Sequence, residues 1–278
     1  MNCSSLLSTK RPRLWLPRFN QIMNIAIIDK ILLNFFYELQ NFFYLTGRTL
    51  LCIFQRPFYY REFAVQFDKL GFSSLFICIL TGLFTGMVMA LQSLIQLKPF
   101  AATSYVGGMV AVTMIKELGP VLASLMVAGR VGSAITAELG TMMVTEQVDA
   151  MRVEGTDIVK RLAAPRMKAM LLALPLLTVV TDAISLLGGY LMSAGYGINP
   201  TMYITGIPQF MVFQDLIEGL VKPAVFGFLI AATGCYVGLN TRGGAEGVGA
   251  AAKKAVVLSS VLILVTDFFL TKIFVAFR

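Results

Sequence analysis

Residues 71–97 read GFSSLFICILTGLFTGMVMALQSLIQL, and none of these 27 side chains carries a charge. At about 1.5 Å per residue, a helix of this length reaches roughly 40 Å, which is enough to cross a bilayer with some tilt. Lys98 and Pro99 end the apolar run. We therefore expect residues 71–97 to form a membrane-spanning helix.

The rest of the chain has the same apolar character. Of its 278 residues, 57% are hydrophobic and 14% are charged, whereas about 25% of the residues in a typical soluble domain are charged. A single core surrounded by water cannot hide such an excess, so the composition predicts an all-α integral membrane protein. With residues 71–97, four further apolar runs give five spans in a transmembrane domain over residues 71–278: 101–137, 169–194, 223–240 and 255–277.

The second run is too long for one straight span and too short for two spans with a loop. It contains Lys116, Glu117, Pro120 and Arg130. Because proline removes a backbone donor, we expect one long helix that bends near Pro120. Two half-helices that meet at Glu117–Pro120 are the alternative.

Basic residues alternate between the loops. Nine Lys or Arg residues precede Gly71, whereas the first loop between spans has only Lys98. The loop over residues 138–168 has five, the loop over 195–215 has none, and the loop over 241–254 has three. By the positive-inside rule, the N-terminus and the second and fourth loops face the cytoplasm, and the C-terminus faces the opposite side.

The N-terminal part divides into a basic segment, residues 1–29, and an interfacial helical region, residues 30–70. Within residues 30–48 the polar side chains form a narrow stripe among Leu, Ile, Phe and Tyr, which predicts an amphipathic helix at the cytoplasmic membrane surface. A sixth span is the competing interpretation. The stripe consists of Lys30, Asn34, Glu38 and Asn41.

Several classes of site are excluded by composition. The chain has no histidine, which removes Ser-His-Asp triads and HExxH zinc sites, and its four cysteines lack the spacing of metal ligands. No Walker A sequence occurs, because the glycines of residues 243–249 are not followed by Lys-Ser/Thr. We therefore expect no cofactor bound by this chain itself, no enzyme activity and no ATP site. The net charge of +8 is explained by the basic loops, so nucleic acid is not an expected partner.

Charged residues inside the spans are costly unless they are paired or hydrated, and they are usually functional. Fixed ion pairs and a polar transport route explain them equally well. The residues that meet this description are Glu117, Arg130, Asp182 and Asp267, with Lys116 and Glu138 beside them.

Residues 144–155 predict a short helix in the second cytoplasmic loop. Val144, Val148 and Met151 share one face, and Gly155 is a natural stop. The helix is either membrane-bound or a docking site for a protein, and its acidic residues are unfavourable beside anionic lipid.

Small residues recur at four-residue spacing, as in Gly82/Gly86 and Gly234/Gly238. Such faces let helix backbones approach closely in lipid. They indicate either tight packing within the chain or a symmetric dimer interface.

The run ELGPVLASLMVAGRVGSAITAELGTMMVTEQVDA, residues 117–150, resembles the signature of the MlaE/YrbE permeases. Residues 82–92, 164–166 and 241–249 resemble the same family. The resemblance implies the permease subunit of an ATP-driven ABC transporter: a homodimer of five-span subunits, each preceded by an N-terminal interfacial helix. It also implies a separate cytoplasmic ATPase, which uses the ATP, and an MCE-domain protein that exchanges phospholipid with the dimer cavity. Such a system maintains the lipid asymmetry of the outer membrane. A bacterial inner membrane is expected, rather than a plastid inner envelope.

The resemblance also assigns roles to particular residues. Four polar intramembrane residues are expected in the substrate cavity: Lys116, Glu117, Arg130 and Glu138. The short helix of residues 144–155 resembles a coupling helix, with Glu146, Gln147, Asp149 and Arg152 towards the ATPase. The cytoplasmic loop residues Arg242, Gly243, Gly244 and Glu246 form either a turn or a partner contact. An ion-gradient-driven secondary transporter, which would use Asp182 and Asp267, is the alternative function.

Overall fold

The computed structural model describes residues 33, 36–52 and 59–276. The chain divides into two units, Met1–Tyr44 and Leu45–Arg278, and each is described by itself. In the first unit residues 36–44 are helical. The predicted basic segment, residues 1–29, lies outside the described residues, and the interfacial position of the N-terminal helix stays a prediction.

Among the described residues of the second unit, five helical stretches are long and apolar enough to cross a membrane, which confirms the predicted fold class. Each extends beyond the apolar run that predicted it, because the polar residues at its ends continue the helix. The stretches are Tyr60–Phe100, Thr103–Val144, Val159–Gly195, Phe213–Leu239 and Gly244–Ala276.

Four of these stretches are built around one main α-helix. They are α2 (Tyr60–Leu97), α7 (Ala164–Gly195), α9 (Phe213–Leu239) and α10 (Gly244–Ala276). Two 3-10 turns, η1 (Lys98–Phe100) and η2 (Thr103–Tyr105), connect α2 to the next span.

The second span is one continuous helix with two π-helical turns, so the half-helix alternative is wrong. All residues from Val106 to Val144 are helical, and Gly119 donates its N–H to Met114 O, the wide spacing of a π turn. Such turns are rare and occur often at functional sites. The successive segments are α3 (Val106–Thr113), η3 (Met114–Leu118), α4 (Gly119–Val127), η4 (Ala128–Gly132) and α5 (Ser133–Val144).

The small-residue faces pack against other helices of the same chain. Gly82 lies against the backbone of Thr181, and Gly86 lies against the backbone of Ser185, so neither glycine has room for a Cβ atom. The residue numbers rise together on both helices, so α2 and α7 run in parallel. Gly238 packs on α5 in the same way. For these glycines, packing within the chain explains the spacing.

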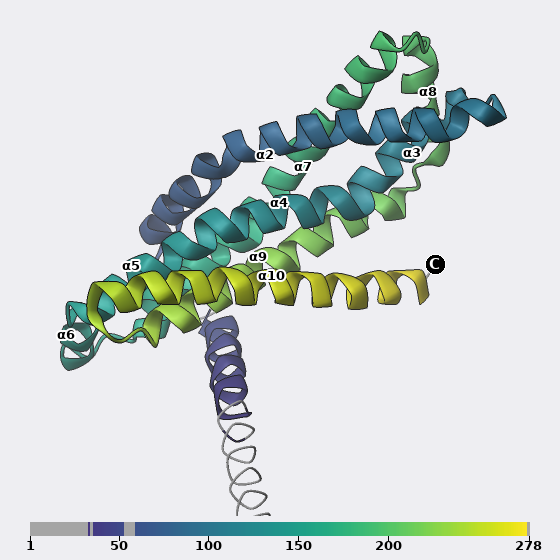
Figure 1. The fold of residues 1–278 in the computed structure, drawn as a ribbon. Coiled ribbons are helices and arrows are strands. Elements are labelled where there is room, and N and C mark those ends of the chain that lie inside the picture. Colours follow the sequence, from purple (N-terminus) through teal and green to yellow (C-terminus); the bar gives the residue numbers. More distant parts are fainter. Residues whose placement is uncertain (1–32, 34–35, 53–58, 277–278) are drawn as a thin grey trace, which may run out of the picture. The chain divides into compact units, whose positions relative to one another are not determined.

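Short helices lie at opposite ends of the five spans (Figure 1). At one end are α6 (Gln147–Val153) and the π turn η5 (Val159–Ala163), and at the other is α8 (Pro200–Phe210). The Asn199 side chain caps α8 by accepting a hydrogen bond from the Thr201 N–H. Burial raises the pKa of the Tyr203 phenol to about 12, and this hydroxyl donates to the Leu186 carbonyl of α7.

Candidate functional site

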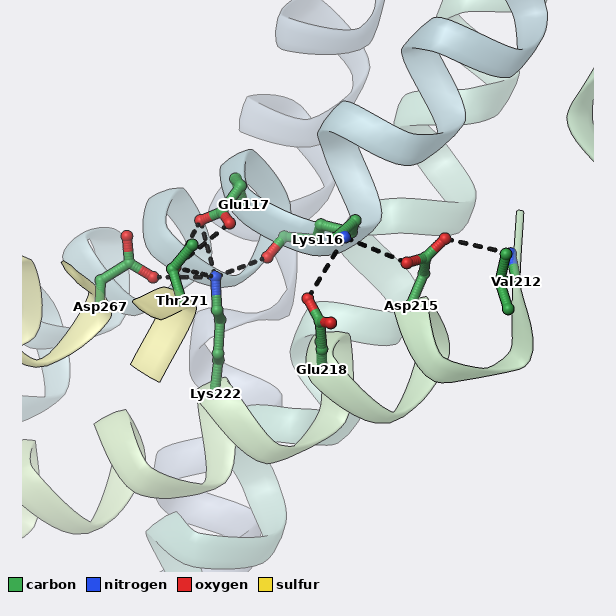
Figure 2. Close-up of polar contacts among 8 residues, drawn as sticks. All are labelled: Lys116, Glu117, Val212, Asp215, Glu218, Lys222, Asp267 and Thr271. Atoms are coloured by element: carbon green, nitrogen blue, oxygen red, sulfur yellow. Dashed lines mark hydrogen bonds and ion pairs between the residues drawn. The ribbon is translucent and has the colours of Figure 1, made fainter. Parts of the chain in front are cut away.

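Charged side chains from three spans meet inside the second unit (Figure 2). Lys116 and Glu117 are adjacent in the π turn η3, but they contact different partners. We call the following set the polar cluster: Lys116 and Glu117 of η3; Asp215, Glu218 and Lys222 of α9; and Asp267 and Thr271 of α10.

Lys222 is the centre of one half of the polar cluster, and its side chain has no exposed surface. Its Nζ lies 2.7 Å from Glu117 Oε2 and 3.3 Å from Asp267 Oδ1, and it donates to Thr271 Oγ1 at 2.8 Å. The Thr271 hydroxyl in turn donates to Glu117 at 3.3 Å. The ammonium group therefore links the second, fourth and fifth spans.

Lys222 also donates to the backbone carbonyl of Lys116, at 3.1 Å. This bond attaches the fourth span to the backbone of the π turn η3 as well as to its side chains.

Lys116 is the centre of the other half. Its Nζ lies 3.1 Å from Asp215 Oδ1 and 3.5 Å from Glu218 Oε2. The other oxygen of Asp215 accepts from the Val212 N–H, which caps the start of α9 (Figure 2). Asp215 therefore fixes both the beginning of a span and the orientation of Lys116.

The polar cluster contains four carboxylates and two ammonium groups, and the exposure of these groups differs. The side chains of Asp215 and Glu218 are almost completely buried, whereas those of Glu117 and Asp267 are 37% and 20% exposed. Buried ion pairs of this kind are costly to desolvate and strongly destabilising to break. The most exposed charged groups of the polar cluster are therefore the carboxylates of Glu117 and Asp267.

Glu138 is not part of the polar cluster. It lies further along the same span and accepts from Arg166 of α7 at 2.9 Å and from Lys69 of α2 at 3.0 Å. Arg166 also donates to the Leu162 carbonyl. This arrangement ties three helices together near α6, so the position of Glu138 favours the fixed-ion-pair interpretation for that residue.

Arg130 lies apart from both groups. It is exposed in the π turn η4, and no ion pair involves it among the described residues. A charged side chain at the surface of a membrane span needs a partner or water. Arg130 is therefore free to contact a molecule other than this chain.

The short helix predicted for residues 144–155 is present as α6, over Gln147–Val153, and its coupling role stays a prediction. Val148 is completely buried, whereas Glu146, Gln147, Asp149 and Arg152 are exposed. Gly155 has a φ of 75° and ends α6, as expected from the sequence. Asp149 and Arg152 form an exposed ion pair at 2.9 Å. The helix thus offers a charged face to the surroundings and anchors itself by one apolar residue.

The glycine-rich loop is a tight turn between α9 and α10. Gly243 and Gly244 have φ angles of 93° and 66°, which favour glycine. Arg242 and Glu246 beside them are exposed. The two glycines are explained by the turn, and a partner contact of the loop stays a prediction.

The sequence analysis missed Asp215, Glu218 and Lys222. It began the fourth span at Pro223, whereas α9 begins at Phe213 and contains this proline. The three charges occur at positions i, i+3 and i+7, which place them on one face of a helix. That spacing was the available signal.

A family comparison covers most of the described chain. The model of the permease MlaE family matches residues 63–273. The chain belongs to the MlaE permease family. The match includes every member of the polar cluster and α6.

Comparison with individual proteins agrees with this family assignment. A protein named as a probable ABC transporter permease of Rickettsia typhi is 39% identical over 91% of this chain and 98% of its own length. The chloroplastic protein trigalactosyldiacylglycerol 1 of Arabidopsis thaliana is 37% identical over 83% of this chain and 66% of its own. The intermembrane phospholipid transport system permease protein MlaE of Haemophilus influenzae is 32% identical over 75% and 80%. This MlaE-family chain is thus a multi-pass ABC permease subunit.

Proposed function

We propose that this chain is the permease subunit of an ATP-driven transporter that moves phospholipid between a bacterial inner membrane and an MCE-domain partner. Family membership carries the proposal: the match spans the five membrane helices, and a relative within it is named for intermembrane phospholipid transport. The chain has no Walker A sequence, so a separate subunit hydrolyses the ATP.

The ATPase docks on α6. This helix projects at one end of the spans (Figure 1), and its exposed residues include Glu146, Asp149 and Arg152. Residues 138–168, which comprise α6 and the adjoining ends of two spans, include five basic residues, which favours the cytoplasmic side. The N-terminus is then cytoplasmic and the C-terminus periplasmic.

Phospholipid contacts the exposed charges of the second span. The Glu117 carboxylate is the most exposed acid of the polar cluster, and Arg130 is an exposed cation in the same span. Carboxylate and guanidinium groups suit the amine and the phosphate of a headgroup, respectively. Apolar surfaces of the spans would hold the acyl chains.

A second copy of the chain completes the cavity. Helix α10 exposes a long apolar surface, which includes Val257, Val261, Leu264 and Phe268. In this proposal part of that surface lies between the two copies and part faces lipid. The mass of the purified permease, measured with the detergent contribution subtracted, should equal that of two chains, and a mass of one chain would contradict the dimer.

The ATPase assignment is tested by copurification. Reversing the charge of Glu146 and Asp149 together, to Lys, should reduce the amount of ATPase that copurifies with the permease. Asp68→Lys, at an exposed position of α2, is the control and should leave copurification unchanged. The purified permease alone should hydrolyse no ATP and should support hydrolysis when the ATPase is added. Unchanged copurification of the double variant would remove the docking role of α6.

A further inference from the structure

Asp182 is a buried acid in the middle of α7 that the polar cluster does not include. Only 9% of the residue is exposed, and its Oδ1 has no hydrogen-bond partner. An ionised carboxylate in such a position loses its hydration without compensation, which is far more costly than burial of a neutral group.

No basic side chain lies within ion-pair distance of Asp182 in the described part of the chain. The nearby basic residues have other partners: Lys116 pairs with Asp215 and Glu218, and Lys222 pairs with Glu117 and Asp267.

Three other titratable groups on helices around α7 have partners of their own. Cys78 of α2 contacts the Thr181 hydroxyl, and the Tyr203 phenol of α8 donates to Leu186. Glu117 of η3 is bound to Lys222. None of these groups supplies a positive charge to Asp182.

Asp182 lies directly against the second span, where the π turn ends. Its Oδ1 occupies the space in which Gly119 would carry a Cβ atom, and Met114 O lies 2.8 Å from the same point. Both oxygens therefore face the same small space beside Gly119. A carboxylate oxygen and a carbonyl oxygen that approach each other there repel, since both carry partial or full negative charge. A proton on the carboxyl group turns the same approach into an O–H···O=C hydrogen bond.

We propose that Asp182 is a proton-binding site within the membrane, whose protonated carboxyl group donates to the Met114 carbonyl and holds α7 against the π turn η3. The turn carries Lys116 and Glu117, so the proton fixes the third span against the element that orients the polar cluster. Loss of the proton leaves an uncompensated carboxylate at this contact and separates the two helices. The inference does not depend on the transported molecule.

Infrared spectroscopy tests the site directly. The full-length chain, purified at neutral pH in a detergent that has no ester or carboxyl group, should show the carbonyl-stretching band of a protonated carboxylic acid. This band should be absent from Asp182→Asn. Asp68→Asn is the control, because Asp68 is an aspartate at an exposed position of α2, and it should retain the band.

The amide of Asp182→Asn is uncharged and nearly isosteric with a neutral acid, so this variant should also fold and unfold at the temperature of the wild type. Asp182→Asn that keeps the full band would overturn the proposal, as would a large loss of thermal stability in this variant. The spectrum is recorded without an ATPase or transported lipid, so a failure of lipid transport leaves it unaffected.

Discussion

Lys222 of the fourth span holds its ammonium group at a position with no exposed surface, among oxygens from the second and fifth spans. Two of these oxygens belong to the carboxylates of Glu117 and Asp267. The net value of a complete buried ion network is small, because desolvation offsets attraction. Removal of one partner has a large effect, because the remaining charges lose their compensation.

Lys222→Met should therefore lower the free energy of unfolding by about 3 kcal/mol or more. Methionine keeps a long unbranched side chain, so loss of the charge dominates. Lys253→Met, at an exposed position of α10, is the control and should change stability by less than about 0.5 kcal/mol. Denaturant titration of each purified variant measures its free energy of unfolding. Equal stability of Lys222→Met and the wild type would contradict a structural role for the network.

If uncompensated charge causes the loss of stability in Lys222→Met, removing its two acidic partners should restore stability. Combining Lys222→Met with Glu117→Gln and Asp267→Asn removes the charges together, so most of the lost stability should return. If the triple variant is no more stable than Lys222→Met, uncompensated charge is not the cause of the loss.

At the level of single residues, part of the candidate site could be predicted from the sequence. Glu117 and Asp267 were identifiable because a charge stands out in an apolar run. Lys222 was not, since Pro223 follows it and was taken as the beginning of a span. The partner of each charge could not be predicted, because pairing depends on how three spans pack together.

At the scale of elements, the contact between α2 and α7 depends on glycine. Gly86 lies against the backbone of Ser185, and a Cβ atom there would overlap the backbone oxygen. Backbone cannot move aside as a flexible side chain can, so the two helices would have to separate.

Gly86→Ala should therefore lower the free energy of unfolding by about 1–3 kcal/mol. Gly249→Ala is the matched control, because a Cβ atom on Gly249 of α10 meets nothing within 4 Å. In that open helical position alanine should be neutral or stabilising by up to about 1 kcal/mol. The stability of the two variants is compared in the same detergent. A similar effect in both would contradict the close packing of α2 on α7.

Element boundaries were harder to predict than element identity. Five apolar runs predicted five spans because the bilayer sets a minimum length. The π turns η3 and η4 have no corresponding signal in composition. The one long helix predicted around Pro120 is confirmed, and its bend stays a prediction. The wider hydrogen-bonding pattern of η3 accommodates the proline without a break.

At the scale of the whole molecule, the number of spans and the distribution of charge lead to one testable topology. The five spans of the described residues place Tyr60 and Ala276 on opposite sides, and the parallel course of α2 and α7 agrees with one intervening span. Residues 138–168, which comprise α6 and the adjoining ends of two spans, include five basic residues, whereas residues 195–215 include none. Both features predict that α6 faces the cytoplasm and α8 the opposite side.

Single cysteines test this topology in a variant whose four native cysteines are replaced by alanine. Glu154→Cys after α6 and Met202→Cys in α8 are both at exposed positions. A membrane-impermeant maleimide added to intact spheroplasts should label Met202→Cys and leave Glu154→Cys unlabelled. In inverted membrane vesicles the labelling should be reversed, which controls for access of the reagent to each site. Labelling of both cysteines from the same side would require an even number of spans between them. That result would contradict the assignment of Val159–Gly195 as a single crossing and, with it, the docking of a cytoplasmic ATPase on α6.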